Sequence, residues 1–233
     1  MVVGSSVAAT LVPGLDRWAA EHGNVQVLDK SRFWCPLGRG LPIAQGFVVH
    51  LPGGACSDWG TRWSAAIASF DPDVVLVFFS IWEIAPRQLP GSTTWLQPGA
   101  APLDAWQLSE YRTAADVLSA RGAAVDWLTI PCENQPTPVG SPLWYVNRRT
   151  IPALAASRPS VHVVDLDQEI CRSGAGHDYA GVRDARPDGA HFSRAGAFAV
   201  SKWLMSVVLG QRPNPTVVGE ANPGTRAVTR RAS

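Results

Sequence analysis

The sequence has no long hydrophobic run and almost no net charge. Its longest apolar stretch, residues 195–209, is interrupted by Lys202, so it falls short of the roughly 18 residues that span a bilayer. The N-terminus also lacks the basic region and apolar stretch of a signal peptide. Lys and Arg number 20 against 19 Asp and Glu, a net charge of +1, which indicates neither nucleic-acid binding nor attraction to anionic lipid. These absences leave an ordinary globular chain.

Metal-binding cysteine patterns are missing as well. The four cysteines, Cys35, Cys56, Cys132 and Cys171, form no Cys-x-x-Cys pair and have no histidine at zinc-finger spacing, so we expect no metal site. All four lie in sequence typical of loops, where an even number favours two disulfides and an oxidising compartment over buried thiols. Of the three possible pairings, nearness in sequence favours Cys35–Cys56 and Cys132–Cys171.

Apolar runs of strand length alternate with segments of helical spacing. Five strands are predicted, one before Gly4 and the others at 24–28, 74–79, 124–130 and 161–165. Helical spacing follows Ser6, where Pro13 should kink the helix or shift its start, and returns at 103–120, at 142–157 and after Ser193. This alternation predicts an α/β fold with a parallel sheet, whose sites lie at the carboxyl ends of the strands.

The domain is predicted to cover residues 1–210. From residue 211 to residue 233 the chain is rich in Pro, Gly, Thr and Arg without periodicity, which is typical of a disordered tail. The chain also opens inside what looks like a strand, so we expect it to be a piece of a larger protein.

Polar side chains follow the predicted strands. The first strand ends at Gly4-Ser5-Ser6, and Asp188 and His191 lie in the last loop before the final helix. An Asp three residues before a His can accept the imidazole Nδ1–H and leave Nε2 free to take a proton from a serine. Ser6, His191 and Asp188 are therefore candidates for nucleophile, base and orienting carboxylate in acyl transfer.

Each of these residues also has a purely structural interpretation. A serine after a strand is often an N-cap, and an Asp-x-x-His near a helix start is often a capping arrangement. The other four histidines show no spacing that indicates metal ligation. The serine turn and the Asp-x-x-His loop occurring together, at opposite ends of one α/β domain, favour chemistry.

The sequence resembles the SGNH (GDSL) hydrolase superfamily. Residues 4–11 resemble its first block, usually Gly-Asp-Ser, and residues 188–193 resemble its last block, Asp-x-x-His. The resemblance implies a flavodoxin-like three-layer α/β/α fold with Ser6 as nucleophile, its backbone N–H as an oxyanion donor, His191 as base and Asp188 as its partner. Two departures stand out, because Ser5 replaces the aspartate of the first block and Trp82 stands where an asparagine normally donates to the oxyanion.

A narrower resemblance is to the SGNH domains fused to actinobacterial acyltransferase-3 membrane proteins. It rests on Ser80–Glu83 with Arg87 downstream, Cys35 in the second block, and the segments Thr129–Cys132 and Arg186–Ser193. It implies an extracytoplasmic domain, tethered to the plasma membrane, that receives an acyl group from a fused membrane domain. Ser80, Trp82, Glu83 and Arg87 become candidate substrate-binding residues, although a salt bridge to Glu83 is the alternative role of Arg87.

Three functions follow from these residues. The first is an O-acyltransferase that moves an acetyl, succinyl or similar group through an acyl-serine to hydroxyls of cell-envelope glycans or glycolipids, without a cofactor. The second is a carboxylesterase, which would use the same three residues. The third is a catalytically silent glycan-binding domain. Four tryptophans are candidate sugar platforms, with core packing as the alternative: Trp59, Trp63, Trp82 and Trp95.

Overall fold

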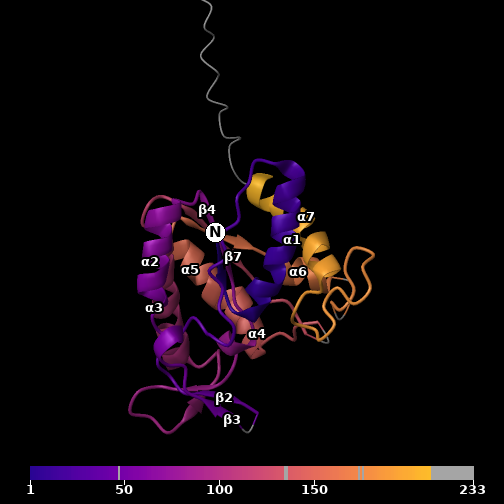
Figure 1. The fold of residues 1–233 in the computed structure, drawn as a ribbon. Helices are drawn as coiled ribbons and strands as arrows, with labels where there is room; N and C mark the ends of the chain where they lie inside the picture. The colour runs from indigo at the N-terminus through magenta and orange to yellow at the C-terminus, as the bar shows by residue number, and fades with distance from the viewer. Residues whose placement is uncertain (47, 134–135, 173, 175, 211–233) are drawn as a thin grey trace, which may run out of the picture.

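A central parallel sheet organises the molecule (Figure 1). The computed structural model describes residues 1–46, 48–133, 136–172, 174 and 176–210, and the tail predicted at 211–233 lies outside these residues. The sheet has four strands, in the order β1 (Val2–Gly4), β4 (Val74–Phe78), β7 (Ala124–Leu128) and β8 (Val161–Val164), and all neighbouring pairs are parallel.

Helices cover both faces of this sheet. One face packs against α1 (Ser6–His22), α6 (Leu166–Cys171) and α7 (Arg194–Gly210). The other face packs against α2 (Trp59–Phe70), α3 (Ala101–Leu118) and the helical segment formed by α4 (Pro142–Tyr145), the π-helical turn η3 (Val146–Thr150) and α5 (Ile151–Ser157). The predicted three-layer α/β/α architecture is therefore confirmed. No helix in the described part of the chain combines the length and the hydropathy needed to cross a bilayer.

The prediction of a fifth strand at residues 24–28 was wrong. This segment runs beside β1, where Val2 N–H donates to Leu28 O and Lys30 N–H donates to Val2 O, but only Asp29 forms a parallel bridge, to Val2. Because β1 itself has three residues, it offers too short an edge for a regular fifth strand. The alternation of Val25 and Val27 reflects partial burial against the core without strand pairing.

A second, small sheet lies beyond the carboxyl ends of the parallel strands (Figure 1). Its neighbours are antiparallel, in the order β3 (Val48–His50), β2 (Ile43–Gln45), β5 (Arg87–Gln88) and β6 (Trp95–Leu96). Two short 3₁₀ turns accompany it, η1 (Gly54–Cys56) and η2 (Ile81–Glu83). Strands of two or three residues give no readable periodicity, so the sequence did not predict this sheet.

The two disulfides form in the pairing that the sequence favoured. Cys35 bonds Cys56, and Cys132 bonds Cys171. The first joins the segment after β1 to η1, and the second joins the loop after β7 to the last residue of α6. Both bridges therefore fasten loops at the end of the sheet where the polar residues gather.

Close contact between α1 and α7 fixes the two ends of the chain that carry the candidate site. Gly14 faces α7 so tightly that a Cβ on it would lie 2.2 Å from the backbone carbon of Ala197. Pro13 is tolerated inside α1, which runs without a break to a left-handed cap at Gly23. Ser193 caps α7 as predicted, since its hydroxyl accepts from the Gly196 N–H at 3.2 Å.

Candidate active site

Ser6 lies at the sharp turn between β1 and α1. A Cβ on Gly4 would lie 1.8 Å from Phe78 O, and its φ is +152°, so only glycine fits where the turn begins. Ser5 is the N-cap residue of α1, its side chain makes no capping hydrogen bond, and Ser6 is the first helical residue. The N-cap interpretation of Ser6 is therefore not what the structure has. Ser6 N–H instead belongs to a helix N-terminus, where negative charge is stabilised.

The loop before α7 brings His191 to Ser6. The Ser6 Oγ lies 2.7 Å from His191 Nε2, and His191 Nδ1 lies 2.6 Å from Asp188 Oδ2. With the Nδ1 proton held by the carboxylate, Nε2 is the acceptor for the serine proton. The three residues that the sequence selected therefore form one continuous series of hydrogen bonds, although Ser6 and His191 are 185 positions apart in the chain.

Asp188 both orders its loop and holds the ring. Its Oδ1 accepts from the backbone N–H groups of Ala190 and His191, at 2.9 and 2.7 Å, while Oδ2 serves the imidazole. Burial raises the pKa of the Asp188 carboxyl, but the hydrogen bonds from the His191 ring and from these two N–H groups outweigh it and lower the pKa to about 2. The carboxyl is therefore ionised at neutral pH, as an orienting group must be.

Two further residues, which the sequence did not single out, hold the loop in place. Thr10, one turn along α1 from Ser6, accepts from the Phe192 N–H at 3.1 Å through its Oγ1. Arg186 is 1% exposed and donates to the carbonyl oxygens of Gly176 and Gly189. Thr10 was visible only as a helical residue four positions after Ser6, and Arg186 only as part of the last motif.

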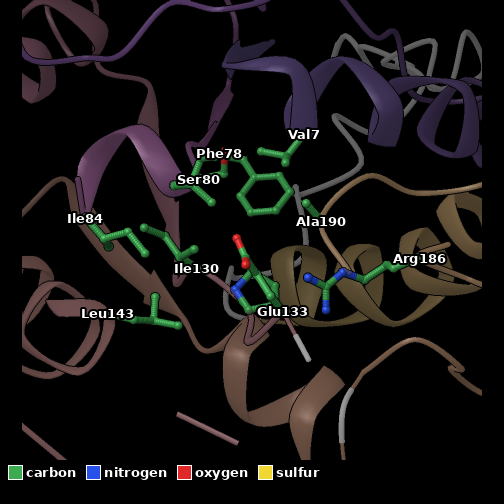
Figure 2. Close-up of a pocket in the computed structure, with 11 residues that line it drawn as sticks. Val7, Phe78, Ser80, Ile84, Ile130, Glu133, Leu143, Arg186 and Ala190 are labelled. Carbon is green, nitrogen blue, oxygen red and sulfur yellow. The ribbon is translucent and has the colours of Figure 1, made fainter. Parts of the chain in front are cut away.

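Ser80, one of the four predicted substrate-binding residues, lies against the serine turn. The Ser80 Oγ is 3.4 Å from the Oγ of Ser5, and Ser5 is the residue that replaces the aspartate of the SGNH first block. Ser80 also lines a pocket with Val7 and Ala190, the neighbours of Ser6 and His191 (Figure 2). Its position is compatible with the predicted substrate contact, which stays a prediction.

Trp82, Glu83 and Arg87 are buried. The Trp82 ring is 5% exposed and meets the rings of His50 and Trp34 edge-on. Glu83 accepts from the Leu37 N–H and from the Tyr111 hydroxyl. Substrate binding by these three residues stays a prediction, and their burial favours a supporting role.

Arg87 forms the ion pair that the sequence offered as its alternative role. Its Nη2 lies 3.7 Å from Glu83 Oε1 and donates to Trp82 O at 2.7 Å. Burial lowers the pKa of the guanidinium, and the charge of Glu83 opposes that change. Because Glu83 also binds the Leu37 N–H, the pair fastens the segment after Cys35 to the turn after β4.

Of the four tryptophans that the sequence offered as sugar platforms, three pack in the protein interior. Trp59, Trp63 and Trp82 are buried, whereas Trp95 is 38% exposed. The most exposed indole described is that of Trp34, at 68%, which the sequence did not select. Trp34 also has a left-handed backbone, with φ at +63°, an uncommon conformation for such a side chain.

Comparison with solved structures places this architecture in a known class. A crystal structure of TesA is 19% identical, and the match covers 89% of this chain and 97% of that chain with a TM-score of 0.53. The periplasmic domain of a lipopolysaccharide acetyltransferase from Salmonella ser. Paratyphi A is 12% identical, with 89% of this chain and 83% of that chain covered and a TM-score of 0.57. The acetyl xylan esterase AlAXEase is 14% identical, with 89% of this chain and 100% of that chain covered and a TM-score of 0.53. The chain has the SGNH hydrolase fold. No family model and no curated protein matches the sequence.

Proposed function

We propose that this chain is an acyl-transferring enzyme that works through an acyl-serine at Ser6. The observation that carries the proposal is the hydrogen-bonded series from Ser6 Oγ to His191 Nε2 and from His191 Nδ1 to Asp188 Oδ2, at 2.7 and 2.6 Å. A glycan-binding domain has no use for a serine hydroxyl bonded to an imidazole whose tautomer is fixed by a carboxylate.

The chemistry takes two steps. In the first, Ser6 Oγ attacks the carbonyl carbon of the acyl donor, and its proton passes to His191 Nε2. The bond from the acyl carbon to its leaving oxygen breaks, and that oxygen takes the proton from His191. In the second step, a hydroxyl of the acceptor gives its proton to His191 and attacks the acyl carbon. The bond from that carbon to Ser6 Oγ then breaks, and Oγ takes the proton from His191, which restores the Ser6 hydroxyl. The Ser6 N–H, at the start of α1, stabilises the oxyanion formed in each step.

For the acceptor we propose hydroxyls of cell-envelope glycans or glycolipids, with an acyl donor delivered by a fused membrane domain. One structure of the same fold is the periplasmic domain of a lipopolysaccharide acetyltransferase. The two disulfides support an extracytoplasmic location. Genomic sequence encoding about ten membrane helices upstream of this segment, as the resemblance implies, would support the fusion; their absence would remove the fused donor and leave the acyl-serine chemistry standing.

Hydrolysis is the second candidate, and the exposure of the site favours it. The side chains of His191 and Asp188 are 40% and 56% exposed, so water has access to the base. An acetyl xylan esterase shares the fold. Transfer and hydrolysis separate in one assay: the chain is given p-nitrophenyl acetate with a methyl glycoside, and products are weighed. An acetylated glycoside indicates a transferase, and acetate alone indicates an esterase.

The acyl-serine itself is tested with a serine-reactive fluorophosphonate and mass spectrometry. We expect one adduct on the parent chain, mapped to the peptide that contains Ser6, and none on Ser6→Ala. The matched control is Ser64→Ala on the outer face of α2, where the hydroxyl bonds only its own helix at Gly60 O; this variant should label like the parent. A folded parent chain that takes no label would contradict both enzyme functions.

A further inference from the structure

A narrow pocket adjoins the candidate nucleophile. Its volume is about 20 Å³, and its walls come from the carboxyl ends of the parallel strands and from the loops that follow them. Val7 and Ala190 line one side, while Ile84 and Leu143 lie on the opposite side (Figure 2). Val7 follows Ser6 and Ala190 precedes His191 in the chain, so the pocket lies next to the segments that carry the 2.7 Å contact between the hydroxyl and the imidazole, although neither Ser6 nor His191 lines it.

The size of the pocket limits what it accepts. A single water needs roughly 10–15 Å³ of such space, so about 20 Å³ takes one or two small groups, such as the methyl of an acetyl. The next carbons of a butyryl chain would meet Ile84 and Leu143. Each methylene that a site accepts or rejects changes kcat/KM by roughly 10- to 200-fold, so the walls discriminate strongly if they hold their shape.

The wall formed by Ile130 is fixed by its backbone. Asn147, in the π-helical turn η3, donates from Nδ2 to Ile130 O and accepts at Oδ1 from Ile130 N–H, both at 2.8 Å. The Asn147 side chain is buried, so moving Ile130 away would break two interior hydrogen bonds. Single π turns of this kind recur at functional sites. Widening the pocket on this side would therefore cost these two buried hydrogen bonds.

Charge at the pocket is already balanced. Arg186 and Glu133 both line it, and the Glu133 carboxylate points into it (Figure 2). Glu133 is also the strongest of the carboxylates that support the positive charge of buried Arg186. An acyl chain that ends in a second carboxylate would meet Glu133 with the same sign of charge. Arg186 has two carbonyl partners, at Gly176 and Gly189, and is not free to turn toward such a chain.

We infer that this pocket is the acyl-binding site and that it selects a short, uncharged acyl group, with acetyl preferred over butyryl and over succinyl. The inference rests on the proposed function, because it is the acyl group on Ser6 Oγ that would enter the pocket. It narrows the range of donors from any acyl ester to those whose chain beyond the carbonyl is one or two carbons long and carries no charge.

The test is a series of p-nitrophenyl esters, the acetate, butyrate, hexanoate and hemisuccinate, given to the whole chain with Ser6→Ala as the background. We expect kcat/KM to fall about tenfold or more from acetate to butyrate, and the hemisuccinate to react more slowly than the butyrate. A flat or rising series would overturn the inference while leaving the acyl-serine intact. Absence of fluorophosphonate label on the parent chain would overturn the proposed function as well, so the two failures are distinguishable.

Three variants test the walls of the pocket. Leu143→Ala should raise the butyrate-to-acetate ratio of kcat/KM at least fivefold, and Ile84→Val is a milder change at the same wall should the first fail to fold. Glu133→Gln should raise the hemisuccinate-to-acetate ratio without changing the butyrate ratio. The matched control is Leu209→Ala, an exposed leucine near the end of α7, which should leave all ratios as in the parent. Unchanged ratios in the folded wall variants would contradict the assignment.

Discussion

Two arginines, Arg87 and Arg186, are equally buried at 1% exposure but are compensated differently. Arg87 lies beside the buried carboxylate of Glu83, which itself binds the Leu37 N–H. Arg186 donates mainly to backbone carbonyls, those of Gly176 and Gly189. Burial lowers the pKa of both guanidinium groups, that of Arg186 to about 10.

The difference shows what each arginine supports. The Arg87–Glu83 pair neutralises itself and fastens interior segments, so its loss leaves a buried carboxylate behind. Arg186 instead fixes the carbonyl that follows Asp188, in the loop that aims His191 at Ser6. One arginine therefore contributes mainly to the stability of the fold, and the other to the geometry of the candidate site.

The largest effect expected from this comparison is on stability. Arg87→Met leaves Glu83 buried without its positive partner, which typically costs about 3–5 kcal/mol. We expect the free energy of unfolding, measured with urea, to fall by that amount, while kcat of the folded fraction falls less than tenfold. The double variant Glu83→Gln with Arg87→Met should lose less than the single one, because no charge is stranded. A double variant that is less stable than Arg87→Met would contradict the pairing.

The converse substitution should act on catalysis. In Arg186→Met, the Gly189 and Gly176 carbonyls lose their donor, at a cost of about 1–3 kcal/mol, and the His191 loop is free to shift. A misplacement of about 1 Å can cost on the order of 100-fold in rate, so we expect kcat on p-nitrophenyl acetate to fall about 100-fold. Because Arg186 acts mainly by positioning the His191 loop, kcat should fall more than KM changes, although Arg186 also lines the pocket, and Arg186→Lys should recover part of kcat. A loss confined to stability would make Arg186 merely structural.

The disulfides extend the comparison, because each fastens a different loop at the end of the sheet that carries the site. Gly176, which accepts from Arg186, packs so that a Cβ on it would lie 3.4 Å from Cys132 Sγ. Replacing Cys132 and Cys171 with alanine should cost about 2–4 kcal/mol and also lower kcat, since the Arg186 acceptor is loosened. Replacing Cys35 and Cys56, which close a shorter loop of 21 against 39 residues, should cost slightly less and spare kcat. Equal kcat in both double variants would break this distinction.

Much of the central fold was predictable, since β4 is an uninterrupted apolar run and β7 is apolar except for Asp126. The helix α2 was not predicted, and neither was the small antiparallel sheet, whose strands of two or three residues are set by tertiary pairing between β2 and β5. The same limit explains the wrong fifth strand at residues 24–28. Periodicity reports burial, and a segment can be half-buried beside a sheet without joining it.

In the candidate site, Ser6, Asp188 and His191 were predictable because each lies in a local motif with a known chemical use. Thr10, Arg186 and Glu133 were not. The contact of Thr10 Oγ1 with Phe192 N–H spans 182 positions, and Arg186 meets the Gly176 and Gly189 carbonyls only because the loop between them folds around its side chain. The sequence showed Arg186 as part of the last motif, but it did not indicate that its side chain is buried. Its importance follows from burial and from the carbonyls it meets, which only folding brings together.

The smallest effect expected is the pH dependence of the Asp188 contribution to stability. Its pKa is lowered to about 2 in the folded chain from a usual 3.8, so the folded state favours the ionised form. That contribution is fully present above roughly pH 4 and is lost as the pH falls through about 2. Because the side chain is 56% exposed, solvent screening keeps the contribution small.

Urea midpoints of the parent chain and of Asp188→Asn should therefore run parallel from about pH 8 to pH 5 and converge between about pH 4 and pH 2. Convergence that began near pH 6 would mean that the carboxyl is not held ionised by the His191 ring and its loop, and any loss of activity above about pH 4 belongs to another group.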